Sequence, residues 1–119
     1  NMSEKIKLLE TFDNQYQDRN YVITHVQPEF TSVCPKTGNP DFGKITIEYI
    51  PDKKCVELKS LKYYFNSFRN DGIFYESVVN LILDDLVQVL QPRYMKVVGE
   101  FNPRGGMYSV VIVEYPYKK

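Results

Sequence analysis

Histidine and cysteine are scarce in this 119-residue chain, which contains one His and two Cys. A structural zinc site usually takes four Cys or His ligands, and one chain with a single His and two Cys has only three such side chains. Cys34 and Cys55 are also too few for the disulfide framework of a small secreted protein. We therefore expect no bound metal and two free thiols in a reducing compartment, although the sequence alone leaves open one disulfide between them.

Net charge and long apolar runs are lacking as well. Lys plus Arg number 15, as do Asp plus Glu, so the whole chain has no general attraction for nucleic acid or an acidic membrane surface. No apolar run reaches the roughly 20 residues of a membrane-spanning helix, and no signal peptide opens the chain. The expected location is the cytoplasm, and the expected partners are small molecules rather than nucleic acid or membrane.

Length and composition indicate one folded domain. The chain is 43% hydrophobic and 25% charged, which is ordinary for a globular protein and unlike a disordered one. Residues 1–20 are polar without a dominant hydrophobic period, and we predict that they form a mobile N-terminal arm. Residues 21–119 are predicted to form a single domain.

Strand patterns occupy the first half of this domain. "YVITHV" (21–26) has the β-branched content of a strand, and "KITIEYI" (44–50) alternates apolar and polar residues strictly. "CVELK" (55–59) predicts a further short strand. Between the first two strands, "EFTSVCPKTGNPDFG" (29–43) is rich in Pro and Gly and predicts a rigid loop through which no strand runs.

Helical patterns follow. Ser60 is predicted to cap a helix over residues 61–69, "NDG" (70–72) breaks it, and a longer helix is predicted over residues 73–90. The long helix carries an apolar stripe at helical spacing, formed by Phe74, Val78, Ile82, Leu86 and Val89. This stripe predicts that one helix face packs on a core.

Two more strands are predicted near the end of the chain, over residues 94–102 and 106–115, joined by the turn "PRGG" (103–106). The order of elements predicts an α+β domain with both helices on one face of an antiparallel sheet. Such a sheet has two open edges, which favour association. Several subunits pairing edge to edge would close a barrel.

Cys34 and Asp41 are the first candidates for catalysis. A thiol becomes nucleophilic as the thiolate, which backbone N–H groups and a nearby cation such as Lys36 would favour. A loop stiffened by Pro and Gly suits a positioned nucleophile, and Asp41 suits a general acid or base beside it. The structural alternatives are a small buried cysteine and a carboxylate that caps a turn.

A basic stretch, "KKCVELKSLKYYFNSFRN", is the second candidate site. Lys59 and Lys62 are three residues apart at a helix start, so both can point toward one anion, which helix N–H groups would also favour. The commoner outcome is a solvated helix face, and the aromatic run 63–65 would alternatively stack nucleic-acid bases. Glu76, in the first turn of the long helix, suits either a guanine-like edge or the helix dipole.

These pieces together resemble a known family. "FTSVCPKTGNPDF", "VELKSLKYYFNSFRN" and "PRGG", in this order, are similar to the unimodular QueF enzymes, and the resemblance covers about residues 27–106. These enzymes are NADPH-dependent 7-cyano-7-deazaguanine reductases of queuosine biosynthesis, a tRNA modification pathway, and they have the tunnel fold. "ELKSLKYY" satisfies every position of the family signature E-(S/L)-K-(S/A)-x-K-x-(Y/F/W).

The resemblance implies a role for each candidate. Cys34 would add to the nitrile carbon to form a covalent thioimide, and Asp41 would be the proton donor. The implied substrate contacts are Val56, Glu57, Leu58, Tyr75 and Glu76, with Glu76 anchoring the 2-amino pyrimidinone edge. NADPH would bind at Lys59 and Lys62, to which we add Arg69 and Arg104. Family members assemble as rings of five subunits paired face to face, with sites between subunits.

One position departs from the family, and two rival functions remain. The family usually has F-H-E where this chain has Phe74-Tyr75-Glu76, so we expect retained activity with altered affinity or pH dependence. The nearest rival enzyme is the archaeal QueF-like amidinotransferase, which forms the same thioimide but lacks the lysine signature. The non-enzymatic rival is a purine- or RNA-binding module, which would not require Cys34 or Asp41.

Overall fold

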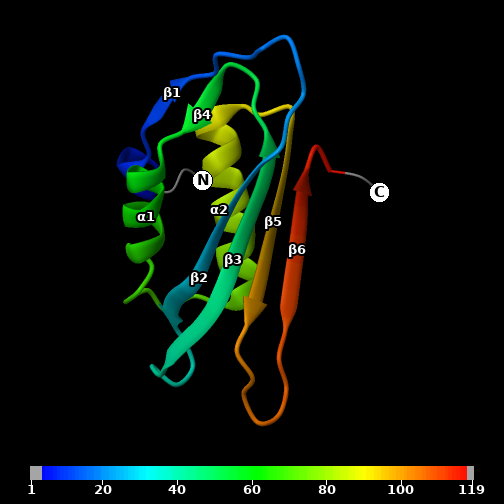
Figure 1. Ribbon diagram of the computed structural model, residues 1–119. Coiled ribbons are helices and arrows are strands. Elements are labelled where there is room, and N and C mark those ends of the chain that lie inside the picture. Colours follow the sequence, from blue (N-terminus) through cyan, green and yellow to red (C-terminus); the bar gives the residue numbers. More distant parts are fainter. Residues whose placement is uncertain (1–3, 118–119) are drawn as a thin grey trace.

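The chain folds as an α+β protein in a computed structural model that describes residues 4–117 (Figure 1). Its elements in chain order are η1 (Glu4–Leu8), β1 (Thr11–Asp13), β2 (Ile23–Val33), β3 (Pro40–Ile50), β4 (Lys54–Val56), α1 (Leu58–Asn66), α2 (Tyr75–Leu90), β5 (Tyr94–Phe101) and β6 (Val110–Tyr115). The long helix and the strands near the C-terminus thus lie close to where their periodicity predicts them.

The main sheet has four antiparallel strands in the order β2-β3-β5-β6, and β1 pairs with β4 in a separate small sheet. Ile45, Ile47 and Tyr49 of β3 are almost completely buried, whereas the intervening Thr46 and Glu48 are partly exposed. The strict alternation in "KITIEYI" is therefore confirmed, because alternate side chains of a strand point to opposite faces.

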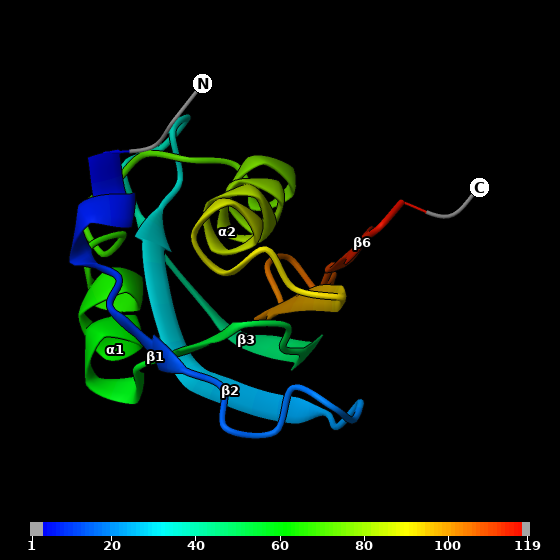
Figure 2. The same cartoon turned by 90° about the horizontal axis from the view of Figure 1, so that it is seen from above.

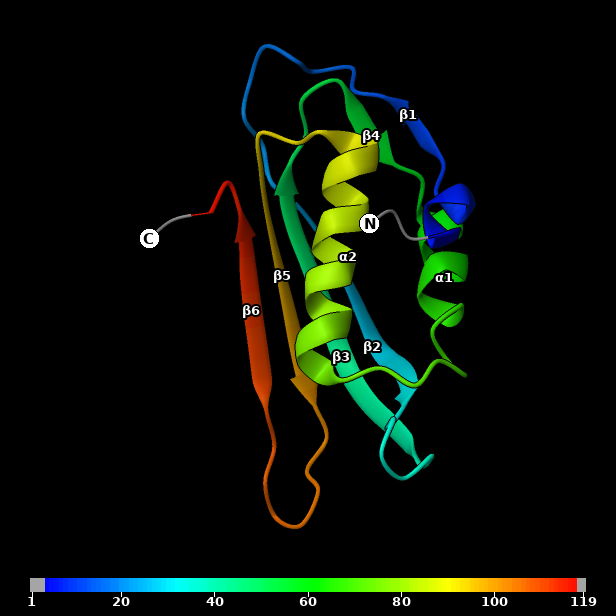
Figure 3. The same cartoon turned by 180° about the vertical axis from the view of Figure 1, so that it is seen from behind.

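The two helices build the core against this sheet. α2 lies along the sheet next to β5 and β6, and α1 packs beside β2 (Figures 2 and 3). Val78, Ile82 and Leu86 of the predicted stripe are fully buried. Burial of each such side chain contributes about 1.5–3 kcal/mol, so this face holds α2 on the sheet. The opposite face of the sheet is not covered by either helix (Figure 1).

The predicted loop over residues 29–43 is largely wrong. β2 continues to Val33 and β3 begins at Pro40, so only residues 34–39 connect them. A register irregularity between Gln27 and Phe30 accommodates Pro28 within β2, and Pro40 occupies the first position of β3. Both prolines therefore sit where a strand tolerates them, and the hairpin extends to Cys34.

The predicted cap of α1 is also wrong. Glu57, not Ser60, is the N-cap residue, and its carboxylate accepts hydrogen bonds from the N–H groups of Lys59 and Ser60, each at 2.8 Å. The helix therefore begins at Leu58, three residues before the predicted start, and β4 ends at Val56. A glutamate reaches the same N–H groups as a serine cap because its longer side chain folds back over the first turn.

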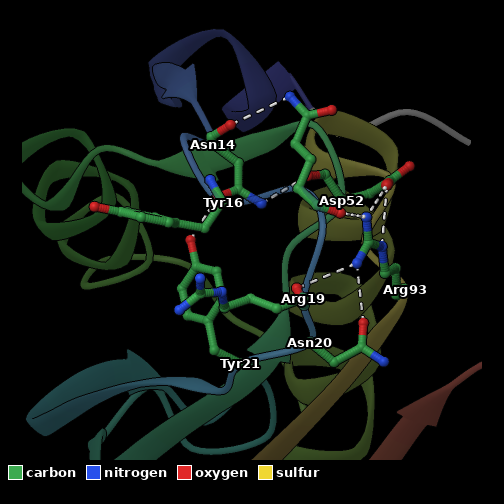
Figure 4. Close-up of polar contacts among 8 residues, drawn as sticks. Asn14, Tyr16, Arg19, Asn20, Tyr21, Asp52 and Arg93 are labelled. Carbon is green, nitrogen blue, oxygen red and sulfur yellow. Dashed lines mark hydrogen bonds and ion pairs between the residues drawn. The ribbon is translucent and has the colours of Figure 1, made fainter.

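Residues 4–13 do not form a mobile arm. β1 pairs with β4, and Ser60 Oγ accepts a hydrogen bond from Glu10 N at 3.0 Å. Further along, Arg93 donates to the carbonyl groups of Gln17 and Arg19 and to the Asn20 side chain, and it forms an ion pair with Asp52 (Figure 4). The N-terminal segment thus packs onto the domain. The boundary after residue 20, between an N-terminal segment and a domain of residues 21–119, stays a prediction.

None of the helices in residues 4–117 is long and apolar enough to cross a membrane. The same residues contain no group of three or more His, Cys, Asp or Glu side chains arranged to hold a metal ion.

Candidate active site

One pocket gathers five of the residues that the sequence predicts for catalysis, substrate and cofactor. It has a volume of about 260 Å³ and is lined by Cys34, Pro35, Thr37, Asp41, Phe74, Tyr75, Glu76 and Arg104. These residues come from three separate parts of the chain: the β2–β3 hairpin, the start of α2 and the β5–β6 connection. The fold thus brings Cys34, Asp41 and Glu76 together around one space.

Cys34 sits in a tight, hydrogen-bonded turn. Its N–H donates to the Asn39 carbonyl at 2.9 Å, and its own carbonyl accepts from Gly38 N at 2.8 Å. Thr37 Oγ1 accepts a further hydrogen bond from Asn39 N at 3.1 Å. These bonds close the six-residue connection between β2 and β3, so the thiol is held by the backbone around it.

The same turn favours the thiolate of Cys34. Hydrogen bonds from the Thr37 hydroxyl and from the backbone N–H groups of Thr37 and Lys36 lower the pKa of the thiol, against the opposing charge of Asp41. Cys34 is partly exposed, whereas Cys55 is buried, and both thiols are free. Cys34 therefore has the exposure and hydrogen-bond donors that a nucleophilic cysteine needs.

Asp41 is a buried carboxylate with two donors on the same oxygen. Its side chain is only 7% exposed, and Oδ1 accepts from Tyr75 Oη at 3.1 Å and from Arg104 Nη2 at 2.9 Å. A buried charge is costly unless it is paired and hydrogen-bonded, and Arg104 and Tyr75 supply both requirements. Together they fix the orientation of the carboxyl group at the pocket.

Arg104 owes its position to the turn that the sequence predicts. Arg104 and Met107 exchange backbone hydrogen bonds, and Gly105 and Gly106 between them have φ angles of +59° and +82°. Two consecutive positive φ angles are typical of the tight hairpin turn in which glycine is strongly favoured. The "PRGG" segment therefore places a guanidinium over Asp41, where it also donates to the Pro40 carbonyl.

Tyr75 is held by the ring of Phe101, which no sequence pattern indicated as part of the site. The Tyr75 ring stacks on Phe101 with centroids 3.9 Å apart and planes 8° from parallel. Burial and the charge of Asp41 raise the pKa of the Tyr75 hydroxyl, so it donates its proton to Asp41 without ionising near neutral pH. Phe101 and Thr37 gave no detectable signal in sequence, because their roles depend on strand register and turn geometry.

The remaining predicted residues lie elsewhere in the chain. Val56 is buried, and Glu57, Leu58, Lys59 and Lys62 line a separate pocket of about 610 Å³ between α1 and β2. Arg69 lines a third pocket of about 440 Å³, which shares Gln27 and Phe65 with the second. Within one chain, residues 56–58 therefore lie away from the pocket of Cys34.

The pocket between α1 and β2, which we call the groove beside α1, is lined by two lysines. Lys59 and Lys62 are exposed one turn apart, and within residues 4–117 neither forms an ion pair. Their ammonium groups lie 5.9 and 5.7 Å from the Tyr63 ring centroid, so both flank one side chain. The first N–H groups of α1 are taken by Glu57, so the cations, rather than the helix end, would hold an anion.

This fold and this pocket define a class of α+β proteins in which a partly exposed cysteine and a buried carboxyl group line one pocket. A sequence model of the family described as QueF-like protein matches residues 40–119. The chain belongs to the QueF-like family.

Known relatives extend this match over nearly the whole chain. The NADPH-dependent 7-cyano-7-deazaguanine reductase of Chloroherpeton thalassium is 61% identical, covering 97% of this chain and 99% of the relative. Proteins of the same name from Chlorobaculum tepidum and Chlorobium luteolum are 61% and 64% identical; the alignments cover 95% and 93% of this chain, and 97% and 96% of the relatives.

A solved structure shares the fold at lower sequence identity. It is described as the archaeosine synthase QueF-Like in the apo form, with a TM-score of 0.73 and 24% identity over 78% of this chain and 91% of that one. The predicted family and the predicted α+β fold are therefore confirmed. The roles of individual site residues and the barrel assembly stay predictions.

Proposed function

We propose that the protein reduces the nitrile of 7-cyano-7-deazaguanine to an aminomethyl group with NADPH, as the names of its relatives indicate for them. The observation that carries the proposal is the convergence of Cys34, Asp41, Tyr75 and Glu76 on one pocket. A partly exposed cysteine with a lowered pKa beside a buried carboxyl group suits addition of sulfur to a nitrile.

The first step forms a covalent bond at Cys34. The thiolate adds to the nitrile carbon, and the nitrile nitrogen takes a proton from Asp41, which gives a thioimide. Asp41 Oδ1 already accepts from Tyr75 and Arg104, so we assign the transferred proton to Oδ2. A nitrile is a poor hydride acceptor and a protonated thioimide is a good one, so this addition divides one difficult step into easier ones.

Two hydrides and one further proton complete the reduction to the amine. Bound NADPH would supply the hydrides, and after the first transfer the C–S bond to Cys34 would break, so that the thiolate leaves as the imine forms. The hydrogen bonds from Thr37 and Lys36 that stabilise the thiolate also make it a better leaving group. Asp41 must regain a proton from solvent for each transfer, which its position on an open pocket permits.

Recognition of the base is assigned to Glu76, whose exposed carboxylate lies at the pocket in the first turn of α2. Val56, Glu57 and Leu58 are the other proposed substrate contacts, and they lie away from this pocket in one chain. A second copy of the chain would bring its own residues 56–58 to Cys34. We therefore propose a homo-oligomer with sites between subunits, and the resemblance to the family implies a ring of five that pairs into a decamer.

The cofactor is assigned to the groove beside α1. Lys59 and Lys62 would bind the phosphates of NADPH, and Arg69 lies in the turn after α1, at the adjoining pocket. Arg104 stays a proposed cofactor contact as well, although in this structure its guanidinium is bound to Asp41. NADPH binding at Arg104 would therefore compete with, or rearrange, that ion pair.

The proposal is tested by mixing the protein with 7-cyano-7-deazaguanine in the absence of NADPH. Intact-protein mass spectrometry should show one adduct with the mass of the substrate, which Cys34→Ala abolishes and Cys55→Ala keeps. NADPH absorbance should then fall on addition of the cofactor. Absence of an adduct from the wild-type protein would contradict the proposal and favour a binding module.

The amidinotransferase alternative gives a different result in the same experiment. It predicts the adduct but no loss of NADPH absorbance, with release of the amidine on addition of ammonia. The archaeosine synthase likeness does not favour this alternative, because at 24% identity it shows the fold only. "ELKSLK" and the relatives of about 60% identity support the reductase instead.

A further inference from the structure

Lys5, in η1, binds the segment that follows α1. Its ammonium group donates to the Ser67 carbonyl at 2.9 Å, forms an ion pair with Asp71 at 2.8 Å and lies 4.6 Å from the centroid of the Phe68 ring. The Lys5 side chain is only 21% exposed, unlike the 77% of Lys7 in the same helix. These contacts join the N-terminal segment to residues 67–71.

The segment that Lys5 binds is also hydrogen-bonded to Val33, the residue before the turn that carries Cys34. The Asp71 carbonyl accepts from Val33 N at 2.9 Å, and Ile73 N donates to the Val33 carbonyl at 3.0 Å. Val33 and Gly72 thus form a parallel bridge on the free edge of β2, one residue before Cys34. A Cβ at Gly72 would lie 3.6 Å from Pro35 Cα, so the segment also packs against the residue after Cys34.

We propose that Lys5 is a positioning residue for the nucleophile, which acts through Asp71 and Val33 to hold the turn that carries Cys34. The path is continuous: Lys5 fixes Asp71, the backbone of residues 71–73 fixes Val33, and Val33 fixes the first residue of the turn. Lys5 is not among the residues that line the Cys34 pocket. The inference rests on the proposed role of Cys34 as the nucleophile.

The geometry of the turn explains why small movements would matter. The donors that favour the thiolate are the Thr37 hydroxyl and the N–H groups of residues 36 and 37, all inside the six-residue connection. Hydrogen bonds weaken steeply when donor and acceptor leave good alignment. Release of Val33 from residues 71–73 would therefore weaken these bonds before it unfolded the sheet.

The test compares Lys5→Met with Lys7→Met. Both replace a lysine of η1 by an unbranched apolar chain, but among residues 4–117 Lys7 pairs only with Glu4, on the surface. Iodoacetamide labelling of Cys34 is followed by peptide mass mapping at several pH values. Lys5→Met should move the midpoint of labelling upward in pH and slow formation of the nitrile adduct about three-fold, as expected from loss of a partly exposed ion pair.

Lys7→Met should match the wild-type protein in both measurements. Lys5→Arg should keep the labelling midpoint and the adduct rate close to those of the wild-type protein, since a guanidinium can also bind Asp71. Asp71→Asn gives a second route if Lys5→Met folds poorly: it should produce the same upward shift. An unchanged labelling midpoint in folded Lys5→Met and Asp71→Asn would overturn the inference. Failure of the wild-type protein to form an adduct would instead contradict the proposed function.

Discussion

Arg104 and Asp41 form an ion pair at the mouth of the Cys34 pocket, with Nη2 of the guanidinium 2.9 Å from Oδ1 of the carboxylate. The family resemblance implies proton transfer by Asp41, Arg104 is predicted from the sequence to contact the cofactor, and the fold places the two side by side. Both donors to Asp41, Tyr75 and Arg104, bind Oδ1, so Oδ2 accepts no hydrogen bond from residues 4–117. Arg104 thus orients the proposed acid in the protein without NADPH.

Arg104→Gln should slow thioimide formation measured without NADPH. The Arg104 side chain is 48% exposed, so the ion pair is expected to contribute about 1 kcal/mol and its loss to slow the adduct about five-fold. Arg19→Gln is the control, because that arginine is exposed and pairs with Asp18 far from the pocket. An unchanged adduct rate, together with a raised KM for NADPH, would assign Arg104 to the cofactor alone.

Tyr75→Phe and Tyr75→His separate the stacking of this ring from its hydroxyl. Phe keeps the stack on Phe101 but removes the donor to Asp41, so adduct formation should slow by about three- to ten-fold. His should add a titration between about pH 5 and 8 to the pH profile of adduct formation, because imidazole ionises in this range and the phenol does not. Tyr108→Phe, at an exposed tyrosine, is the control; identical profiles for all four proteins would rule out a role for the hydroxyl.

Thr37→Val should raise the pKa of the Cys34 thiol toward its usual value of 9.0, because the Thr37 hydroxyl is the leading cause of the lowered pKa. Since the thiolate is the reactive form, the variant should label more slowly at neutral pH and reach the wild-type rate at alkaline pH. The midpoint is measured by iodoacetamide labelling against pH. Thr37→Ser keeps a hydroxyl and should stay close to wild type, and a wild-type midpoint in Thr37→Val would contradict the assignment.

Tyr64→Phe should destabilise the fold by about 1–3 kcal/mol, because Tyr64 Oη donates to the buried carboxylate of Asp85 at 2.5 Å between α1 and α2. Burial raises the pKa of the Tyr64 hydroxyl above 10.0, so its contribution is fully present below pH 10 and is lost as the pH rises above it. Urea unfolding at pH 8 and 11 should therefore show a smaller difference between the two proteins at pH 11.

Tyr63→Phe provides the matched control for that measurement. Tyr63 is the preceding residue of α1 and is 50% exposed, so its substitution should change the free energy of unfolding by less than about 0.5 kcal/mol. Equal stability of the Tyr63 and Tyr64 variants at pH 8 would show that the bond to Asp85 is not stabilising.

Sequence patterns predicted the elements whose periodicity was clear. The alternation of residues 44–50 and the stripe Val78, Ile82 and Leu86 both describe surfaces that the fold buries. The prediction failed where local composition conflicted with strand pairing. Residues 40–43 carry Pro40 and Gly43, and residues 29–33 adjoin the Pro- and Gly-containing turn, yet these two segments pair with each other and form strand. Strand formation at such positions depends on cross-strand partners, which local propensity does not contain.

The N-terminal segment shows the same limit. Residues 4–13 are polar and without a period, but Lys5, Glu10 and β1 each find partners on α1, β4 or the segment after α1. These partners lie far away in sequence, so composition alone suggested an arm. Ser60 illustrates a smaller failure, in which a plausible cap residue lost to a glutamate three positions earlier.

By itself, the sequence determined the α+β class, the long helix, the central strand and, through its motifs, the family and the residues to examine. Only the tertiary structure decided which of those residues meet: Asp41 lies 34 positions from Tyr75 and 63 from Arg104, yet both bind its Oδ1. Such contacts depend on strand register and on the geometry of two hairpin turns. Those features follow from packing between distant segments, which local patterns along a chain do not specify.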